Sequence, residues 1–155
     1  MARRSSSAMT RTDDMAWTLA CGETADYVIF LRYCQLPADF PRARFPVRLN
    51  VFWQVADPTP EGQPKSADGD DMAAFEERIV AATEPAGVAV LPLVLTGRGE
   101  REYVFYARSA DDFLQCLTDM PQEVEPYPVE IYSCDDPDWH YYEAEVAAVQ
   151  PASST

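Results

Sequence analysis

The sequence predicts one small α+β domain, and three observations carry that prediction. The chain has 155 residues, which is the usual size of a single domain. Hydrophobic residues make up 47% of it, enough to build a core without a disulfide or a metal ion. From residue 47 onward, segments with the two-residue alternation of strands are interleaved with segments that have the apolar spacing of helices.

A hairpin opens the predicted domain. It joins residues 17–21 to residues 27–34 through turn-forming residues, and the second segment is strongly β-forming, because it is rich in aromatic and β-branched side chains. Residues 47–56 form the clearest predicted strand, because apolar side chains recur at every second position on one of its faces. These positions are Val47, Leu49, Val51, Trp53 and Val55.

Two amphipathic helices are predicted, over residues 70–83 and 109–120. The first follows a proline-rich loop at 57–69, and the second has Ser109 as its expected N-cap. Their apolar faces are Met72, Phe75, Ile79 and Ala82 in the first helix, and Ala110, Phe113, Leu114 and Leu117 in the second. A short final helix is expected to begin with Asp136 as its cap and Pro137 as its first residue.

The remaining strands are predicted at 88–96, 101–107 and 129–134. Residues 97–100 (Gly-Arg-Gly-Glu) join the first two as a tight hairpin turn. Pro92 lacks the amide hydrogen that a central strand needs, so the strand that contains it is expected at a sheet edge or with a β-bulge.

This order of elements is the βαββαβ arrangement of ferredoxin-like folds, with an antiparallel sheet and helices on one face. The N-terminal hairpin is expected to extend the sheet, and the final helix to follow the last strand. Residues 1–12 are predicted to be a disordered leader, 13–148 the domain and 149–155 a disordered tail.

Charge excludes several classes of partner. The formal net charge is −14, and residues 111–155 contain no lysine or arginine. Nucleic acids and anionic membranes bind cationic surfaces, so neither is expected as a partner. A protein with a basic surface would be attracted. The steering charges are expected at Asp135, Asp136, Asp138, Glu143 and Glu145.

No catalytic motif is recognisable. The chain has one histidine, His140, and its four cysteines are widely spaced, which predicts small buried side chains in a reducing cytoplasm. We therefore assign no catalytic residue, no metal ligand and no cofactor. A protein-interaction or regulatory module is the leading hypothesis.

Two alternatives stay open. Asp135, Asp136, Asp138 and His140 could hold a divalent metal in a hydrolase or nuclease. A small molecule could bind between the proline-rich loops and an aromatic face of the sheet. That face would carry either Tyr103 and Phe105 or Val104 and Tyr106, unless the hairpin or the final helix covers it.

Three stretches carry a resemblance to a known family. They are Gly62-Gln63-Pro64, residues 99–106 (Gly-Glu-Arg-Glu-Tyr-Val-Phe-Tyr) and residues 136–142 (Asp-Pro-Asp-Trp-His-Tyr-Tyr), together with Trp17. The chain resembles the bacterial family catalogued as domain of unknown function 695, over residues 15–148. That family is similar to the regulator of ribonuclease E activity B, a small acidic ferredoxin-like protein that inhibits an enzyme by binding it.

The resemblance assigns no catalytic residue. It directs attention to its two most specific stretches as binding candidates. These candidates are Arg101, Tyr106, Asp136, Asp138 and Trp139.

Overall fold

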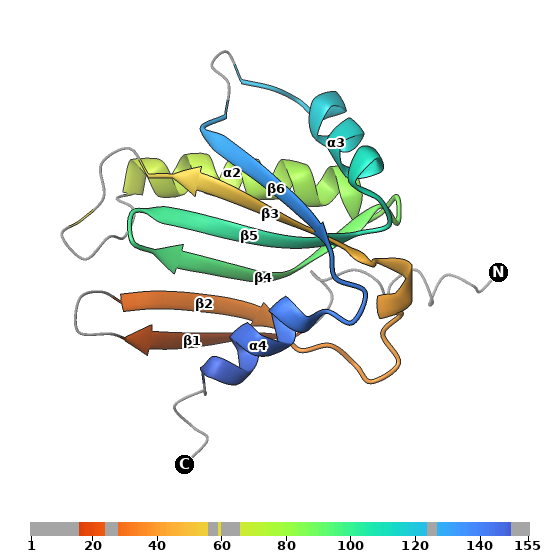
Figure 1. Cartoon of the computed structure of the whole chain (residues 1–155). Helices are drawn as coiled ribbons and strands as arrows, with labels where there is room; N and C mark the ends of the chain where they lie inside the picture. Colours follow the sequence, from red (N-terminus) through yellow and green to blue (C-terminus); the bar gives the residue numbers. More distant parts are fainter. Residues whose placement is uncertain (1–15, 24–27, 56–58, 60–65, 124–126, 150–155) are drawn as a thin grey trace.

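Six antiparallel strands form one sheet in the order β1-β2-β4-β5-β3-β6 (Figure 1). They are β1 (Trp17–Glu23), β2 (Val28–Cys34), β3 (Val47–Gln54), β4 (Ala89–Gly97), β5 (Glu100–Ala107) and β6 (Val129–Asp135). The helices are α2 (Ser66–Thr83), α3 (Ala110–Asp119) and α4 (His140–Ala148), and a short 3₁₀ helix, η2, spans Arg42–Arg44. The predicted α+β class is confirmed.

A computed structural model provides these elements and describes residues 16–23, 28–55, 59, 66–123 and 127–149. The predicted leader, the predicted tail from residue 150 and most of the predicted loop at 57–69 lie outside these residues, as does the Gly-Gln-Pro stretch at 62–64. In the described part of the chain, no helix is long and apolar enough to cross a membrane.

Helices cover the two faces of the sheet unequally. Helices α2 and α3 pack on one face, here called the helix-side face, and α4 crosses the other, the α4-side face (Figure 1). The register places Tyr103 and Phe105 on the helix-side face and Val104 and Tyr106 under α4. The final helix therefore covers the face that carries Val104 and Tyr106, a point that the sequence did not decide. The hairpin β1–β2 extends the sheet beside β4, as predicted.

Pro92 lies at a β-bulge. Strand β4 is not at the edge, because β2 pairs with it from Leu93 to Thr96, so the edge expectation is wrong. On the β5 side the register shifts between Val90 and Leu93. The extra residue reverses the alternation, so that Leu91 and Val94 both face α2. The bulge also turns the Leu91 amide toward the buried carboxylate of Glu84, with 3.0 Å between N and Oε2.

The helix boundaries differ from the predicted ones. Helix α2 begins at Ser66, four residues earlier than expected, and buries Met72, Phe75 and Ile79 completely. Ser109 caps α3 as predicted, accepting from the Asp112 amide at 3.1 Å. Leu114 is 41% exposed, so its predicted place on the buried face is wrong. Ala110, Phe113 and Leu117 pack there as predicted, and Cys116 joins them.

The last helix begins at His140, because Trp139 adopts a left-handed conformation with φ 60°. Asp136 therefore is not its N-cap residue. All four cysteines are free thiols, but only Cys34 is fully buried, and Cys21 is exposed, so the prediction of four buried cysteines is wrong. Val149, at the end of α4, is buried in the α4-side core.

Candidate functional site

The predicted binding residues separate into three places. Tyr106, Asp136 and Trp139 come together on the α4-side face, and Arg101 lies on the helix-side face. Asp138 is at the surface, with a side chain that is 80% exposed. The cluster is buried, Arg101 lines an open groove and Asp138 is in solvent, so the three places have different chemistry.

The carboxylate of Asp136 is enclosed by donors. Tyr106 donates its hydroxyl hydrogen to Oδ2 at 2.7 Å, and the amides of His140 and Tyr141 donate at 2.8 and 3.1 Å. Arg48 approaches the same carboxylate at 3.5 Å. Burial acts to raise the pKa of Asp136, but these hydrogen bonds together bring it below its ordinary value. The carboxylate caps α4 from outside the helix, and it is not available as a steering charge.

Trp139 stabilises the same junction between the sheet and α4. Its ring stacks on Tyr106 with 4.1 Å between centroids, and its indole nitrogen donates to the Phe45 carbonyl at 3.0 Å. The Arg42 guanidinium lies 5.1 Å from the ring centroid and forms a 2.6 Å ion pair with Glu143. Every polar group of the stack has a partner inside the protein, so this cluster fastens α4 to the sheet. The rings of Tyr106 and Trp139 are fully buried in this contact.

The described residues do not form the divalent-metal site that was the alternative at Asp135, Asp136, Asp138 and His140. Asp136 is occupied by its hydrogen bonds, and the pair Asp138–His140 is solvent-exposed with 4.0 Å between Oδ2 and Nε2. Among the residues that the structure describes, no three acidic, histidine or cysteine side chains converge as metal ligands would.

A second groove, of about 460 Å³, lies at the end of α4. Glu102 lines it and accepts from Tyr141 at 2.5 Å and from Asn50 at 2.7 Å. Glu145 lines it too, and its pKa is raised by burial and by the charge of Glu102. The polar groups here are largely paired with one another.

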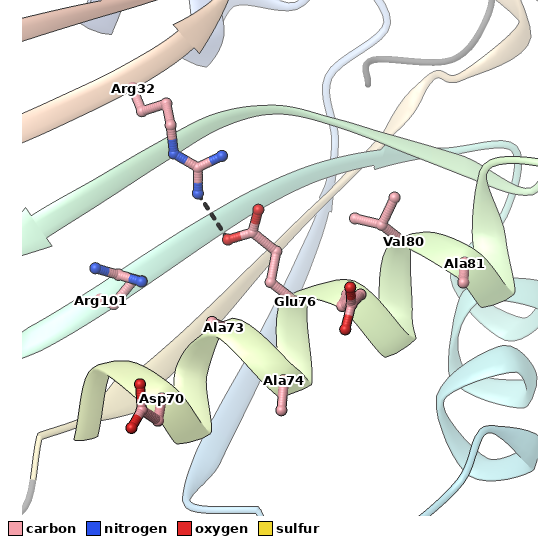
Figure 2. Close-up of a pocket in the computed structure, with 9 residues that line it drawn as sticks. Arg32, Asp70, Ala73, Ala74, Glu76, Val80, Ala81 and Arg101 are labelled. Atoms are coloured by element: carbon pink, nitrogen blue, oxygen red, sulfur yellow. Dashed lines mark hydrogen bonds and ion pairs between the residues drawn. The ribbon is translucent and has the colours of Figure 1, made fainter. Parts of the chain in front are cut away.

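Another groove, of about 840 Å³, runs along α2 on the helix-side face. Figure 2 shows its two walls: Arg32 and Arg101 come from the sheet, and Asp70, Ala73, Glu76 and Val80 come from the helix. A smaller adjoining hollow continues it across the hairpin, lined by Leu19, Phe30 and Thr96. We call the two together the α2 groove.

Strand register builds the floor of the α2 groove. Phe30 lies opposite Thr96, which lies opposite Arg101, so that these three side chains form one row across β2, β4 and β5. Leu19 and Arg32 begin the next row. Because side chains on one face recur every second residue, all five belong to the helix-side face.

Apolar side chains on this floor are open to solvent. Leu19 is 75% exposed and Phe30 is 48% exposed. The cause is architectural: α2 packs beside β4, and no described element covers the helix-side face of β1 and β2 (Figure 1). Leu31, the next residue of β2, points to the α4-side face and shows the contrast, because α4 and its neighbours bury it to 3%.

The two arginines of the α2 groove have different partners. Arg32 pairs with Glu76 at 2.6 Å, and its guanidinium lies 5.0 Å from the Trp17 ring centroid. Arg101 donates its Nε hydrogen to the Thr96 hydroxyl at 2.9 Å. Burial raises the pKa of the neighbouring Tyr103 to about 12, and the positive charge of Arg101 acts against that rise.

Sequence reasoning identified Arg101 but missed Leu19, Phe30 and Arg32. The sequence of the hairpin has apolar residues on both faces, which predicts that other elements cover both faces. A signal was present in the element count, because two helices on one face are too few to cover a sheet of six strands.

Comparison with known proteins gives one match. A family model described as a family of unknown function, DUF695, matches residues 15–144. Neither the curated proteins nor the solved structures contain a match. The match covers the sheet and most of α4, and the chain belongs to this family of unknown function.

Proposed function

We propose that the protein is a non-enzymatic protein-interaction or regulatory module, and that the α2 groove is its docking surface. One observation carries the proposal: the helix-side face of the hairpin exposes Leu19 and Phe30 beside a helix wall, whereas the opposite face is packed. Exposed apolar surface next to a groove is characteristic of an interaction site. An incoming helix or extended segment beside α2 would complete the missing part of the layer.

Charge supports a partner with basic residues. The α2 wall carries Asp70 and Glu77, and neither pairs with a described cation. The net charge of −14 would steer a basic protein toward the whole surface. Asp135, Asp138 and Glu143 contribute to that field as exposed groups, although they do not line the α2 groove.

The fold is consistent with this proposal. We propose that residues 47–135 form a ferredoxin-like unit, which the spatial order β4-β5-β3-β6 supports. We also propose a distant similarity to the regulator of ribonuclease E activity B, which acts by binding an enzyme; such a similarity would point in the same direction. The four free cysteines support a reducing, cytoplasmic location.

The test is affinity purification of the tagged protein from its own host at low salt, followed by mass spectrometry. Three baits are compared: the wild type, Phe30→Glu in the α2 groove, and Tyr132→Ser on β6. Tyr132 is the matched control because it is also an aromatic side chain on a strand and 62% exposed.

We expect a stoichiometric, salt-sensitive partner with the wild type and with Tyr132→Ser, and its loss with Phe30→Glu. A partner that Phe30→Glu retains would contradict the assignment of the α2 groove. A wild-type bait that brings nothing with it would count against an interaction module.

A further inference from the structure

We infer that the α2 groove recognises a single carboxylate on the docking segment, which Arg101 binds, next to an apolar side chain seated on Leu19 and Phe30. This inference rests on the proposed docking function and specifies its partner. The carboxylate belongs to an acidic side chain of a protein segment that is otherwise apolar or basic.

Most of the described arginines form an ion pair with a carboxylate, and Arg101 does not. The chain has 26 acidic residues for 12 lysines and arginines, so an arginine without a carboxylate is unexpected. Five described arginines have a carboxylate within 4.0 Å: Arg32, Arg42, Arg48, Arg78 and Arg108. Arg101 has none among the described side chains, although Glu76 lines the same groove. Arg44 has none there either, but it is exposed, whereas Arg101 is part-buried in the groove.

The surroundings of Arg101 favour the binding of an anion. Its hydrogen-bond partners are the hydroxyls of Thr96 and Tyr103, which are neutral and form no ion pair with it. The bond from Nε to Thr96 holds the guanidinium in the groove, so that an incoming carboxylate meets a partly fixed fork. Because the residue is only partly exposed, a charge-assisted bond there is stronger than one in open water.

The acidic wall of α2 restricts the anion. Asp70, Glu76 and Glu77 face the same groove and would repel a polyanion such as a nucleic acid or a phosphate. A carboxylate carries one charge and is planar, which fits a guanidinium fork. Basic residues elsewhere on the segment would meet the α2 wall.

Spacing on the floor defines the recognised pattern. Phe30 and Arg101 lie two strands apart in one row, on either side of Thr96. Two strand spacings are roughly 10 Å, so the apolar and acidic side chains of the partner should lie within about four residues of each other.

The experiment is selection of a random-peptide library on the full-length protein. We expect enriched peptides to carry Asp or Glu close to a large apolar residue, and Phe30→Glu to abolish their binding. A representative synthetic peptide should bind Arg101→Gln roughly five- to tenfold more weakly than the wild type. Arg44→Gln is the control, because Arg44 is exposed and outside the groove.

A double-mutant cycle makes the assignment specific. Replacing the acidic residue of the peptide by its amide should weaken binding to the wild type as much as Arg101→Gln does, with no further loss when the two changes are combined. Thermal unfolding of Arg101→Gln verifies that the variant is folded. Arg101→Lys keeps the charge but not the fork, so its affinity for the peptide should lie between those of the wild type and Arg101→Gln.

Three outcomes would overturn the inference. Peptides that bind through Phe30 but show no preference for acidic residues would refute the carboxylate and leave the docking function standing. Binding that is indifferent to Phe30→Glu would refute the docking site itself. A dimer of the protein that Phe30→Glu dissociates would name a second copy of the chain as the occupant.

Discussion

The rings of Tyr106 and Trp139 lie 4.1 Å apart and 14° from parallel, and this stack joins the centre of the sheet to the start of α4. The two residues come from the two most specific stretches of the family resemblance, at 99–106 and 136–142. Asp136 completes the contact by accepting from the Tyr106 hydroxyl while it caps α4. The residues that looked most like a binding site are therefore the joint that holds the last helix in place.

Trp139→Ala should be one of the most destabilising substitutions in the protein. The side chain is completely buried and fills the space between Phe40, Tyr106 and Tyr142. Its removal should lower the free energy of unfolding by about 3–5 kcal/mol, measured by urea denaturation. The adjacent exposed residue supplies the control: His140→Ala should change stability by less than about 0.5 kcal/mol. Equal effects of the two would mean that α4 is not fastened by the stack.

Asp136→Asn should reduce the stability of the protein at neutral pH and make that stability less dependent on pH in the acidic range. Folding lowers the pKa of Asp136, so the carboxylate stabilises the protein above its unfolded pKa. That stabilisation is lost as the pH falls through the lower, folded value. At neutral pH the substitution should cost about 1–3 kcal/mol, because Asn keeps one acceptor oxygen, loses the charge and places an NH2 donor where the second oxygen accepted hydrogen bonds.

Thermal unfolding between neutral and strongly acidic pH measures this dependence. The gap between Asp136→Asn and the wild type should narrow as the pH falls. Asp138→Asn, two residues away and exposed, should leave the whole curve nearly unchanged. A gap that stays constant with pH would rule out ionised Asp136 as the source.

The sequence predicted the elements better than their assembly. Alternation in β3 and the apolar stripe of α2 identified buried side chains correctly, because each pattern is local: Val51, Phe75 and Ile79 are all fully buried. Pro92 shows the limit. Its missing amide hydrogen signals an interruption of the ladder, but an edge and a bulge satisfy that requirement equally, and only pairing with the distant β2 decides between them.

The candidate site was less predictable for the same reason. Arg101 was found through a sequence pattern, but its charge is notable only because tertiary structure gives five other arginines a carboxylate and leaves it with Thr96. Exposure of Phe30 likewise depends on where α2 lies, which no property of the hairpin sequence reveals.

Glu84→Ala should reveal how the bulge is stabilised. The Glu84 carboxylate is buried and accepts from the Leu91 amide. Without it that amide is left buried and unsatisfied, at a cost of about 1–3 kcal/mol of unfolding free energy. Amide hydrogen exchange should quicken at Leu91. Glu77→Ala, on the exposed side of α2, is the control, and faster exchange in that variant would argue against the specific role of Glu84.

Glu145→Gln should make the protein slightly more stable at neutral pH. Burial and the charge of Glu102 raise the pKa of Glu145 in the folded state, so its ionised form is less favourable there than in the unfolded chain. Wild-type stability should therefore gain from this group as the pH falls, and the advantage of Glu145→Gln should disappear in acid. Melting temperatures of the two proteins measured across pH test this. A loss of stability at neutral pH would show that the carboxylate makes a favourable contact.

Neighbouring residues of β2 should separate binding from folding. Leu31 is 3% exposed in the α4-side core, and Phe30 points the other way into the α2 groove. Leu31→Ala should cost about 2–5 kcal/mol, as for other buried aliphatic side chains, and Phe30→Ala much less, because half of the ring already contacts water. Urea denaturation of the two variants gives the comparison. If Phe30→Ala proved as destabilising as Leu31→Ala, the exposed ring would have a structural role, and its use as a docking surface would lose its main support.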